Sequence, residues 1–222
     1  MSDTDSFIEE VTEEVRRDRL FGYLRRYGWI AVLAVLVLVG GAAWHEWRKA
    51  QDLAAAQALG DGIIAALEQD EAAARAESLA GVDAATPQGD VVLVLLRAAE
   101  LEAAGDNAAA VEILDALSAN GDTPLIYRQL AGFKSVLLQS DSLAADQRRL
   151  RLEGLIQTGS TLRLLAEEQL ALIDISEDAP QAAIERLQRI MSDAEATSGL
   201  RRRASQLIVA LGGDVAAGTA AN

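Results

Sequence analysis

The chain of 222 residues contains no cysteine and only one histidine, His45. Without cysteine it can form no disulfide bond, no thiolate metal site and no cysteine nucleophile. A zinc site would need carboxylate ligands alone, which is unusual. His45 itself lies beside Trp44 and Trp47, where a polar side-chain tip next to aromatic rings has an ordinary structural role. The glycine-rich stretches LGDG and ALGG follow no predicted strand and introduce no phosphate-binding lysine. We therefore expect no catalytic residue, no metal and no cofactor, and a protein that is not an enzyme.

Aromatic and basic residues are also scarce. Aromatic side chains make up 4% of the chain, whereas hydrophobic residues, dominated by alanine and leucine, make up 50%. Because β-sheets favour aromatic and β-branched residues, this composition predicts an all-α fold. The 34 acidic residues outnumber the 20 lysines and arginines and give a net charge of −14. Such a surface repels phosphate groups, so we expect no nucleic-acid partner, and nothing in the sequence indicates a small-molecule substrate.

One long uncharged run is present, over residues 27–44. As a helix it would be about 27 Å long, enough to cross the hydrocarbon core of a membrane. All three tryptophans lie at its ends, Trp29 at the first and Trp44 and Trp47 at the second, which is typical of interfacial anchors. The small residues 41–43 also fit a signal-peptide cleavage site, but the charged segment before the run is long for a signal peptide. We predict a retained, single transmembrane helix over residues 27–44.

Basic residues on either side of this helix predict its orientation. Five arginines precede it, namely Arg16, Arg17, Arg19, Arg25 and Arg26, and two basic residues, Arg48 and Lys49, follow closely. The flank richer in lysine and arginine stays in the cytoplasm. In a bacterial inner membrane the chain would thus be a single-pass type II protein, with its N-terminus in the cytoplasm. The domain that follows, residues 45–212, would lie in the periplasm.

The two ends of the chain carry weaker patterns. In the cytoplasmic leader, residues 1–26, Phe7, Val11 and Val15 recur at four-residue spacing. This spacing fits a surface helix, and a solvated charged tail fits the composition equally well. Residues 213–222 have little to bury, and we expect them to be a disordered tail.

Helix signals follow one another through residues 45–212, with no convincing strand between them. We expect the transmembrane helix to continue over 50–68 and a second helix over 71–79. Asp90 is a good N-cap for a third helix that ends at Gly105, and Asp106 or Asn107 would cap a fourth. The remaining helices are predicted over residues 124–139, 144–156, 161–176, 179–194 and 199–211, with start signals at Thr123–Pro124 and Asp178–Pro180 and a stop at Gly212–Gly213.

Two segments of this domain repeat at a constant offset of 73 residues, which is close to two units of about 34 residues. They are VLLRAAELEAAGDNAAAVEILDAL from Val94 and EEQLALIDISEDAPQAAIERLQRI from Glu167. The offset pairs Ala98 with Ala171, Ala110 with Ala183, Leu114 with Leu187 and Leu117 with Ile190. These positions resemble the tetratricopeptide repeat, in which small residues let two helices approach closely.

The match to that repeat is degenerate. Leu101 and Asp174 stand where the family prefers tyrosine, and Asp178 replaces the turn glycine found at Gly105. The resemblance implies a TPR-like array of antiparallel helix pairs with the six residues Ala98, Ala110, Leu114, Ala171, Ala183 and Leu187 at helix contacts. The other interpretation is that antiparallel alanine-rich helices produce the same spacing without a repeat.

Arg201, Arg202 and Arg203 form the densest basic cluster in an otherwise acidic domain. In the first turn of a helix these charges oppose the helix dipole, so they need acidic neighbours or a partner. One interpretation pairs them with nearby acids such as Asp193 and Glu195, and the other makes them a partner-binding site.

The order of parts resembles the tetratricopeptide-repeat-like family of ancillary SecYEG translocon subunits, in the versions found in alphaproteobacteria. The passages that carry the resemblance are TPLIYRQLAGFKSVLLQ and the segment from LRLLAEEQLALIDI through LRRRASQLIVALGG. The resemblance implies a protein-interaction module that associates with the translocon and with a membrane-anchored periplasmic chaperone of the prolyl-isomerase type, assisting exported proteins. The alternative is a scaffold or assembly subunit of another cell-envelope complex.

Overall fold

The fold is all-helical, as predicted. The computed structural model describes the backbone of residues 3–214 and the side chains of residues 25, 26, 28–30 and 32–214. Within these residues there are nine α-helices and no strand. The helices are α1 (Asp3–Leu67), α2 (Ala72–Ala80), α3 (Pro87–Ala103), α4 (Asn107–Ala119), α5 (Leu125–Leu138), α6 (Ala145–Gln157), α7 (Arg163–Ser176), α8 (Pro180–Ser192) and α9 (Ser198–Ala210). The chain divides into two compact parts, an N-terminal part, residues 1–57, and a C-terminal part, residues 58–222.

The N-terminal part consists of α1 as far as Gln57. From Gly28 onward this helix is long and apolar enough to cross a membrane. Its apolar side chains are open to the surroundings, with Leu36 63% and Leu38 73% exposed. Burying such a surface in lipid rather than leaving it in water is favourable. The face formed by Phe7, Val11 and Val15 in the leader lies outside the described side chains, although the backbone there belongs to α1.

Two tryptophans are grouped at the C-terminal end of the apolar run. The ring centroids of Trp44 and Trp47 lie 5.5 Å apart, and the Arg48 guanidinium lies 5.9 Å from the Trp44 centroid. Aromatic rings beside a cation fit the headgroup layer of a bilayer, where apolar and charged surroundings meet. This grouping lies where the predicted transmembrane helix, residues 27–44, ends.

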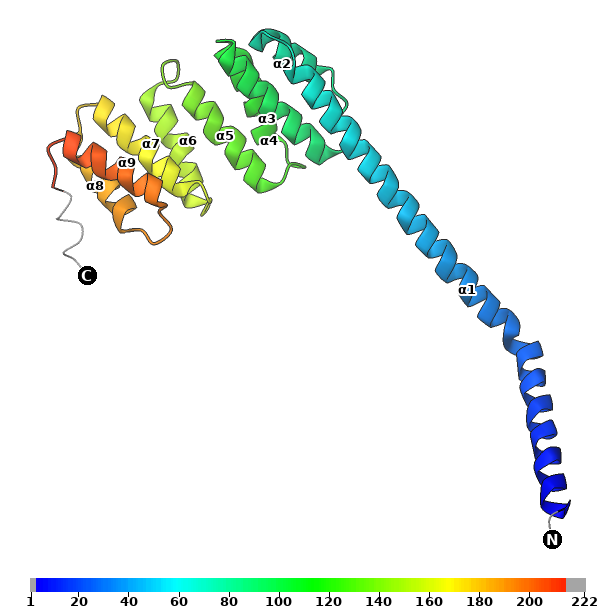
Figure 1. The fold of residues 1–222 in the computed structure, drawn as a ribbon. Coiled ribbons are helices and arrows are strands. Elements are labelled where there is room, and N and C mark those ends of the chain that lie inside the picture. The colour runs from blue at the N-terminus through cyan, green and yellow to red at the C-terminus, as the bar shows by residue number, and fades with distance from the viewer. Residues whose placement is uncertain (1–2, 215–222) are drawn as a thin grey trace. The chain divides into compact units, whose positions relative to one another are not determined.

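The C-terminal part has four small cores in series instead of one central core. In chain order the clusters of buried apolar side chains join the end of α1 to α2 and α3, then α3 to α4 and α5, α5 to α6 and α7, and α7 to α8 and α9. Each helix from α2 onward packs against the next one along the chain (Figure 1). Contacts mainly between helices that are close in sequence are typical of proteins built by stacking similar units.

The predicted N-cap of α3 at Asp90 is wrong. The N-cap is Thr86, four residues earlier, so the helix begins at Pro87, and the Gly89 N–H donates to Thr86 Oγ1 at 3.1 Å. Thr86 has extended backbone and Pro87 stands at the first helical position, where its missing N–H costs nothing. A Cβ on Gly89 would lie only 2.4 Å from the Ala84 carbonyl oxygen, so this close turn also needs glycine.

The same dipeptide behaves differently at Thr123–Pro124, where the predicted threonine cap does not form. Thr123 is buried and its N–H donates to the Asn120 carbonyl oxygen at 3.1 Å, which holds it in the preceding turn. Pro124 therefore becomes the N-cap, and α5 begins at Leu125. Neighbouring packing thus decides which of two identical sequence signals acts as a cap.

Gly105 and Asp178 end α3 and α7 in the same conformation. Both have positive φ, 80° at Gly105 and 56° at Asp178. The residue after each donates back to the preceding helix, Asp106 N–H to Leu101 O and Ala179 N–H to Asp174 O, both at 2.9 Å. This is the hydrogen bond of a left-handed C-terminal cap. Asp178 therefore does occupy the position of the turn glycine, as the 73-residue offset predicts.

Candidate protein-interaction site

The six residues predicted at helix contacts are all buried. Their exposed fractions are 1% for Ala98 and 0% for Ala110, Leu114, Ala171, Ala183 and Leu187. The first three belong to the core between α3, α4 and α5, and the last three to the core between α7, α8 and α9. The two triplets thus occupy matching places in two separate cores.

The repeat extends further than the two helices seen in the sequence. Shifting the bounds of α4, 107–119, by 73 residues gives those of α8, 180–192, and α5 and α9 likewise begin 73 residues apart. Ala131 on α5 and Ala204 on α9 obey the same offset, and both are 0% exposed. Sequence reasoning missed this pair, although carrying the offset past residue 190 finds it. A three-helix unit, α3–α5, therefore recurs as α7–α9.

A buried carboxylate on α7 joins three helices, α6, α7 and α8. Asp174 is 3% exposed and accepts from Arg149 on α6 at 2.6 Å and from Arg186 on α8 at 2.8 Å. Glu177 also pairs with Arg149, and this hydrogen bond raises the pKa of the Arg149 guanidinium. The sequence offers no signal for this network, because the partners lie far apart along the chain. Charge pairing through Asp174 thus links α6, α7 and α8.

The three consecutive arginines on α9 have different surroundings. Arg203 donates to both oxygens of Glu168 on α7, each at 2.7 Å, and this pairing raises the pKa of its guanidinium. Arg201 donates to the backbone carbonyl of Asp193 at 2.9 Å, after the end of α8. Arg202 is exposed and has no ion-pair partner among the described side chains. The cluster therefore mainly ties α9 to α7 and α8, and Arg202 is the one of the three without a hydrogen bond or ion pair to the described residues.

The acids predicted to pair with that cluster bind another arginine. Arg163, the first residue of α7, donates to both Asp193 oxygens at 2.8 and 3.0 Å and to Glu195 at 2.7 Å. The hydrogen bond from Arg163 lowers the pKa of Asp193, and the same contact raises the pKa of Arg163. This two-pronged pairing fixes the start of α7 against the loop after α8.

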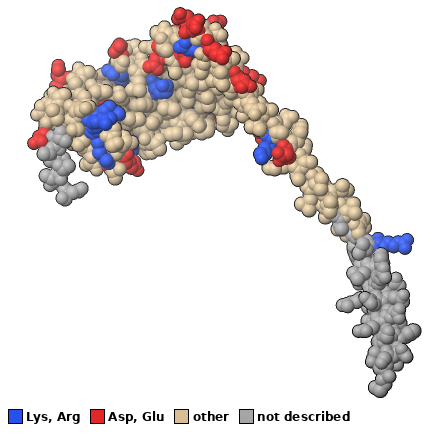
Figure 2. Space-filling view, viewed as in Figure 1, with Lys and Arg blue, Asp and Glu red and all other residues tan. Residues whose placement is uncertain are grey.

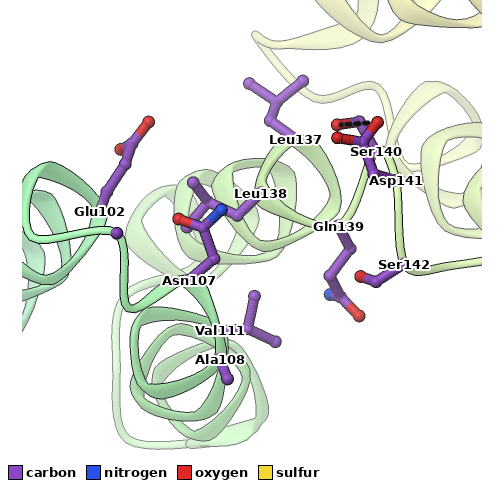
Figure 3. Close-up of a pocket in the computed structure, with 11 residues that line it drawn as sticks. Glu102, Asn107, Ala108, Val111, Leu137, Leu138, Gln139, Ser140, Asp141 and Ser142 are labelled. Carbon is purple, nitrogen blue, oxygen red and sulfur yellow. Dashed lines mark hydrogen bonds between the residues drawn. The ribbon is translucent and has the colours of Figure 1, made fainter.

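An open depression of ≈ 840 Å³ lies between the α3–α4 turn, the start of α4 and the end of α5 with the loop that follows (Figure 3). Apolar side chains, Val111, Leu137 and Leu138, lie in it between polar ones. Leu137 is 36% exposed, so part of this apolar surface is uncovered. Glu102 and Asp141 supply negative charge at the depression. Such a lining suits a polypeptide segment with apolar and basic side chains.

The titratable side chains of the lining are the carboxylates of Glu102 and Asp141. The lining holds carboxylates, amides, hydroxyls and aliphatic groups, without histidine or lysine. In the described part of the chain, no group of three or more His, Asp or Glu side chains could hold a metal ion. The face drawn in Figure 2 is mostly uncharged surface between small groups of acidic and basic side chains.

Comparison of the chain with protein-family models, with curated proteins and with solved structures found no match.

Proposed function

We propose that this protein is a membrane-anchored interaction module. Residues 27–44 hold it in a bacterial inner membrane with the N-terminus in the cytoplasm, and the TPR-like domain works in the periplasm. There it associates with the SecYEG translocon and with a membrane-anchored periplasmic chaperone, and it assists exported proteins. The observation that carries the proposal is the recurrence of α3–α5 as α7–α9 beside an open, partly apolar depression, in a chain with an exposed apolar helix.

Stacked helices support this role because they leave extended surfaces that take up a peptide or a partner's helix. In the depression, Val111, Leu137 and Leu138 supply apolar contact, and Glu102 and Asp141 supply charge at the edge. A membrane tether raises the local concentration of other membrane proteins, so that weak contacts become sufficient. Together, the depression and the tether favour docking of other membrane proteins over a domain that acts alone in the periplasm.

Affinity purification from solubilised membranes tests the partner. Ala108 is exposed and lines the depression, whereas Ala116 is exposed on the same helix, α4, outside it. We expect translocon subunits and a periplasmic chaperone with the wild type and with Ala116→Arg, and a loss of at least one of them with Ala108→Arg. Recovery of only the chain itself, or of an unrelated envelope complex, would replace the proposal by the scaffold alternative.

Cysteine accessibility tests the orientation without background, because the chain has no cysteine of its own. A membrane-impermeant maleimide added to intact spheroplasts should label Ser142→Cys and should leave Ser6→Cys unlabelled until the membrane is lysed. The reverse pattern would refute a periplasmic domain.

A further inference from the structure

A small pocket of ≈ 100 Å³ lies between the first turns of α3 and α5 and is separate from the depression described above. Two carboxylates, Asp90 and Asp122, line it together with Asn120 and the Tyr127 side chain. Asp90 and Asp122 are exposed, and neither has an ion pair within the described part of the chain. The pocket therefore combines two uncompensated negative charges with an aromatic side chain.

The internal repeat shows what the corresponding place holds in the second three-helix unit. At the offset of 73 residues, Asp90 corresponds to Arg163, and the loop residues Asn120 and Asp122 correspond to Asp193 and Glu195. There the Arg163 guanidinium lies against both acids, donating to Asp193 at 2.8 and 3.0 Å and to Glu195 at 2.7 Å. The second unit thus fills this place with an arginine of its own.

The loop that forms the pocket has the same conformation in both units. Asn120 and Asp193 have φ of −73° and −74°, and both are extended. Their side chains accept from the N–H two residues later, at 3.0 Å for Asn120 and 2.9 Å for Asp193. The first unit therefore keeps the frame that binds a guanidinium, but an aspartate stands where the second unit has its arginine.

We propose that the pocket of Asp90, Asn120, Asp122 and Tyr127 binds an arginine side chain of a partner polypeptide. The partner's guanidinium takes the place that corresponds to the one Arg163 occupies in α7–α9, where Arg163 donates to Asp193 and Glu195. Arginine suits this pocket better than lysine, because its planar group pairs with carboxylates in two-pronged fashion and stacks on an aromatic ring. In the second unit Leu200 stands at the position of Tyr127, so the ring belongs to the unit whose pocket lacks an internal arginine.

Apolar side chains next to the pocket indicate what flanks the arginine. Leu125 and Ile126, in the same first turn of α5 as Tyr127, are 58% and 44% exposed. Their counterparts in the second unit are Ser198 and Gly199, so this position in the fold does not require apolar residues. The bound segment therefore carries an arginine flanked by aliphatic side chains. This inference rests on the proposed function in taking a protein as the ligand, and it adds the chemistry of the segment.

A labelled synthetic peptide tests the pocket directly, with the full chain in nanodiscs of zwitterionic lipid. The probes are fluorescent SALRLAS-amide and the same peptide with citrulline in place of arginine, and binding is followed by fluorescence anisotropy. Citrulline keeps the shape and removes the charge. We expect the arginine peptide to bind at least about tenfold more tightly than the citrulline peptide, since a charge-assisted pair is lost with the charge. Equal affinities would overturn the proposal.

Variants locate the binding. Asp90→Arg reproduces the arrangement of the second unit, so its own guanidinium should pair with Asp122, fill the pocket and lower the affinity for the arginine peptide to that of the citrulline peptide. Asp122→Asn, a change in an exposed loop, should weaken binding several-fold. Asp146→Asn removes the same charge outside the pocket and should bind like the wild type. Unchanged binding by both pocket variants would refute the site.

No translocon component is present in this assay, so it fails or succeeds independently of the purification experiment. If the peptide binds as expected but no translocon subunit is recovered from membranes, the arginine-binding pocket is supported and the proposed translocon partner is refuted. Recovered translocon subunits with no preference for arginine would do the opposite.

Discussion

Replacing Ala183 by leucine tests the close contact between α7 and α8. Ala183 is 0% exposed and lies in one core with Ala171, which is also 0% exposed. Because both methyl groups are fully buried, a longer side chain must push the helices apart or adopt a strained rotamer. Overpacking of this kind costs about 1–3 kcal/mol of the free energy of unfolding. At about 2–4 °C per kcal/mol for a domain of this size, the Tm should fall by about 2–12 °C.

The neighbouring residue provides the matched control. Ala182 precedes Ala183 on α8 and is exposed, so Ala182→Leu adds the same atoms without entering the core. Thermal unfolding followed by far-UV circular dichroism is suitable, because all three tryptophans lie in α1 and their fluorescence does not report on the repeats. Ala110→Leu, at the matching position of α4, should lower the Tm by a similar amount. Equal Tm values for Ala183→Leu and Ala182→Leu would refute the close-contact argument.

Three further results are expected. Asp174→Asn should lower the free energy of unfolding by about 1–3 kcal/mol in urea titrations, since it weakens pairing to two partly buried arginines; a change below about 0.5 kcal/mol would contradict this. Asp178→Gly should raise that free energy by about 1 kcal/mol and Gly105→Asp should lower it, because only glycine adopts positive φ without strain; the opposite signs would exclude the turn assignment. Arg163 lowers the pKa of Asp193, so the stabilisation from Asp193 is present above the ordinary carboxyl pKa and is lost as pH falls through the lowered one; the difference in stability between wild type and Asp193→Asn should be constant near neutral pH and shrink below about pH 4, and a difference that grows on acidification would contradict the pairing.

The sequence predicts the helices and their packing better than their ends. Ala98 and Ala171 were found because burial of small residues repeats at a fixed spacing, which is a property of the chain itself. The start of α3 was misplaced because Asp90 and Thr86 both carry capping oxygens, and only the turn around Gly89 decides between them. Thr123 has the right residue type for a cap but is buried in the preceding turn.

The candidate sites were less predictable, because charge pairing depends on three-dimensional neighbours. Arg203 pairs with Glu168, 35 residues away, and no local pattern predicts that distance. Asp90 has the residue type of a helix N-cap, and only the three-dimensional repeat relates its pocket to the place that Arg163 fills. A repeat thus becomes informative about function where its two copies differ.

Photo-crosslinking in native membranes tests the central claim most directly. A crosslinking amino acid is placed at Asn107 or Asp141, in the depression, and for comparison at the exposed residues Glu153 or Gln157 on α6. Mass spectrometry then identifies the adducts. The account predicts adducts with translocon subunits or a periplasmic chaperone from the first two positions and few from the other two. Adducts only with the chain itself or with an unrelated complex, or equal yields from all four positions, would contradict it.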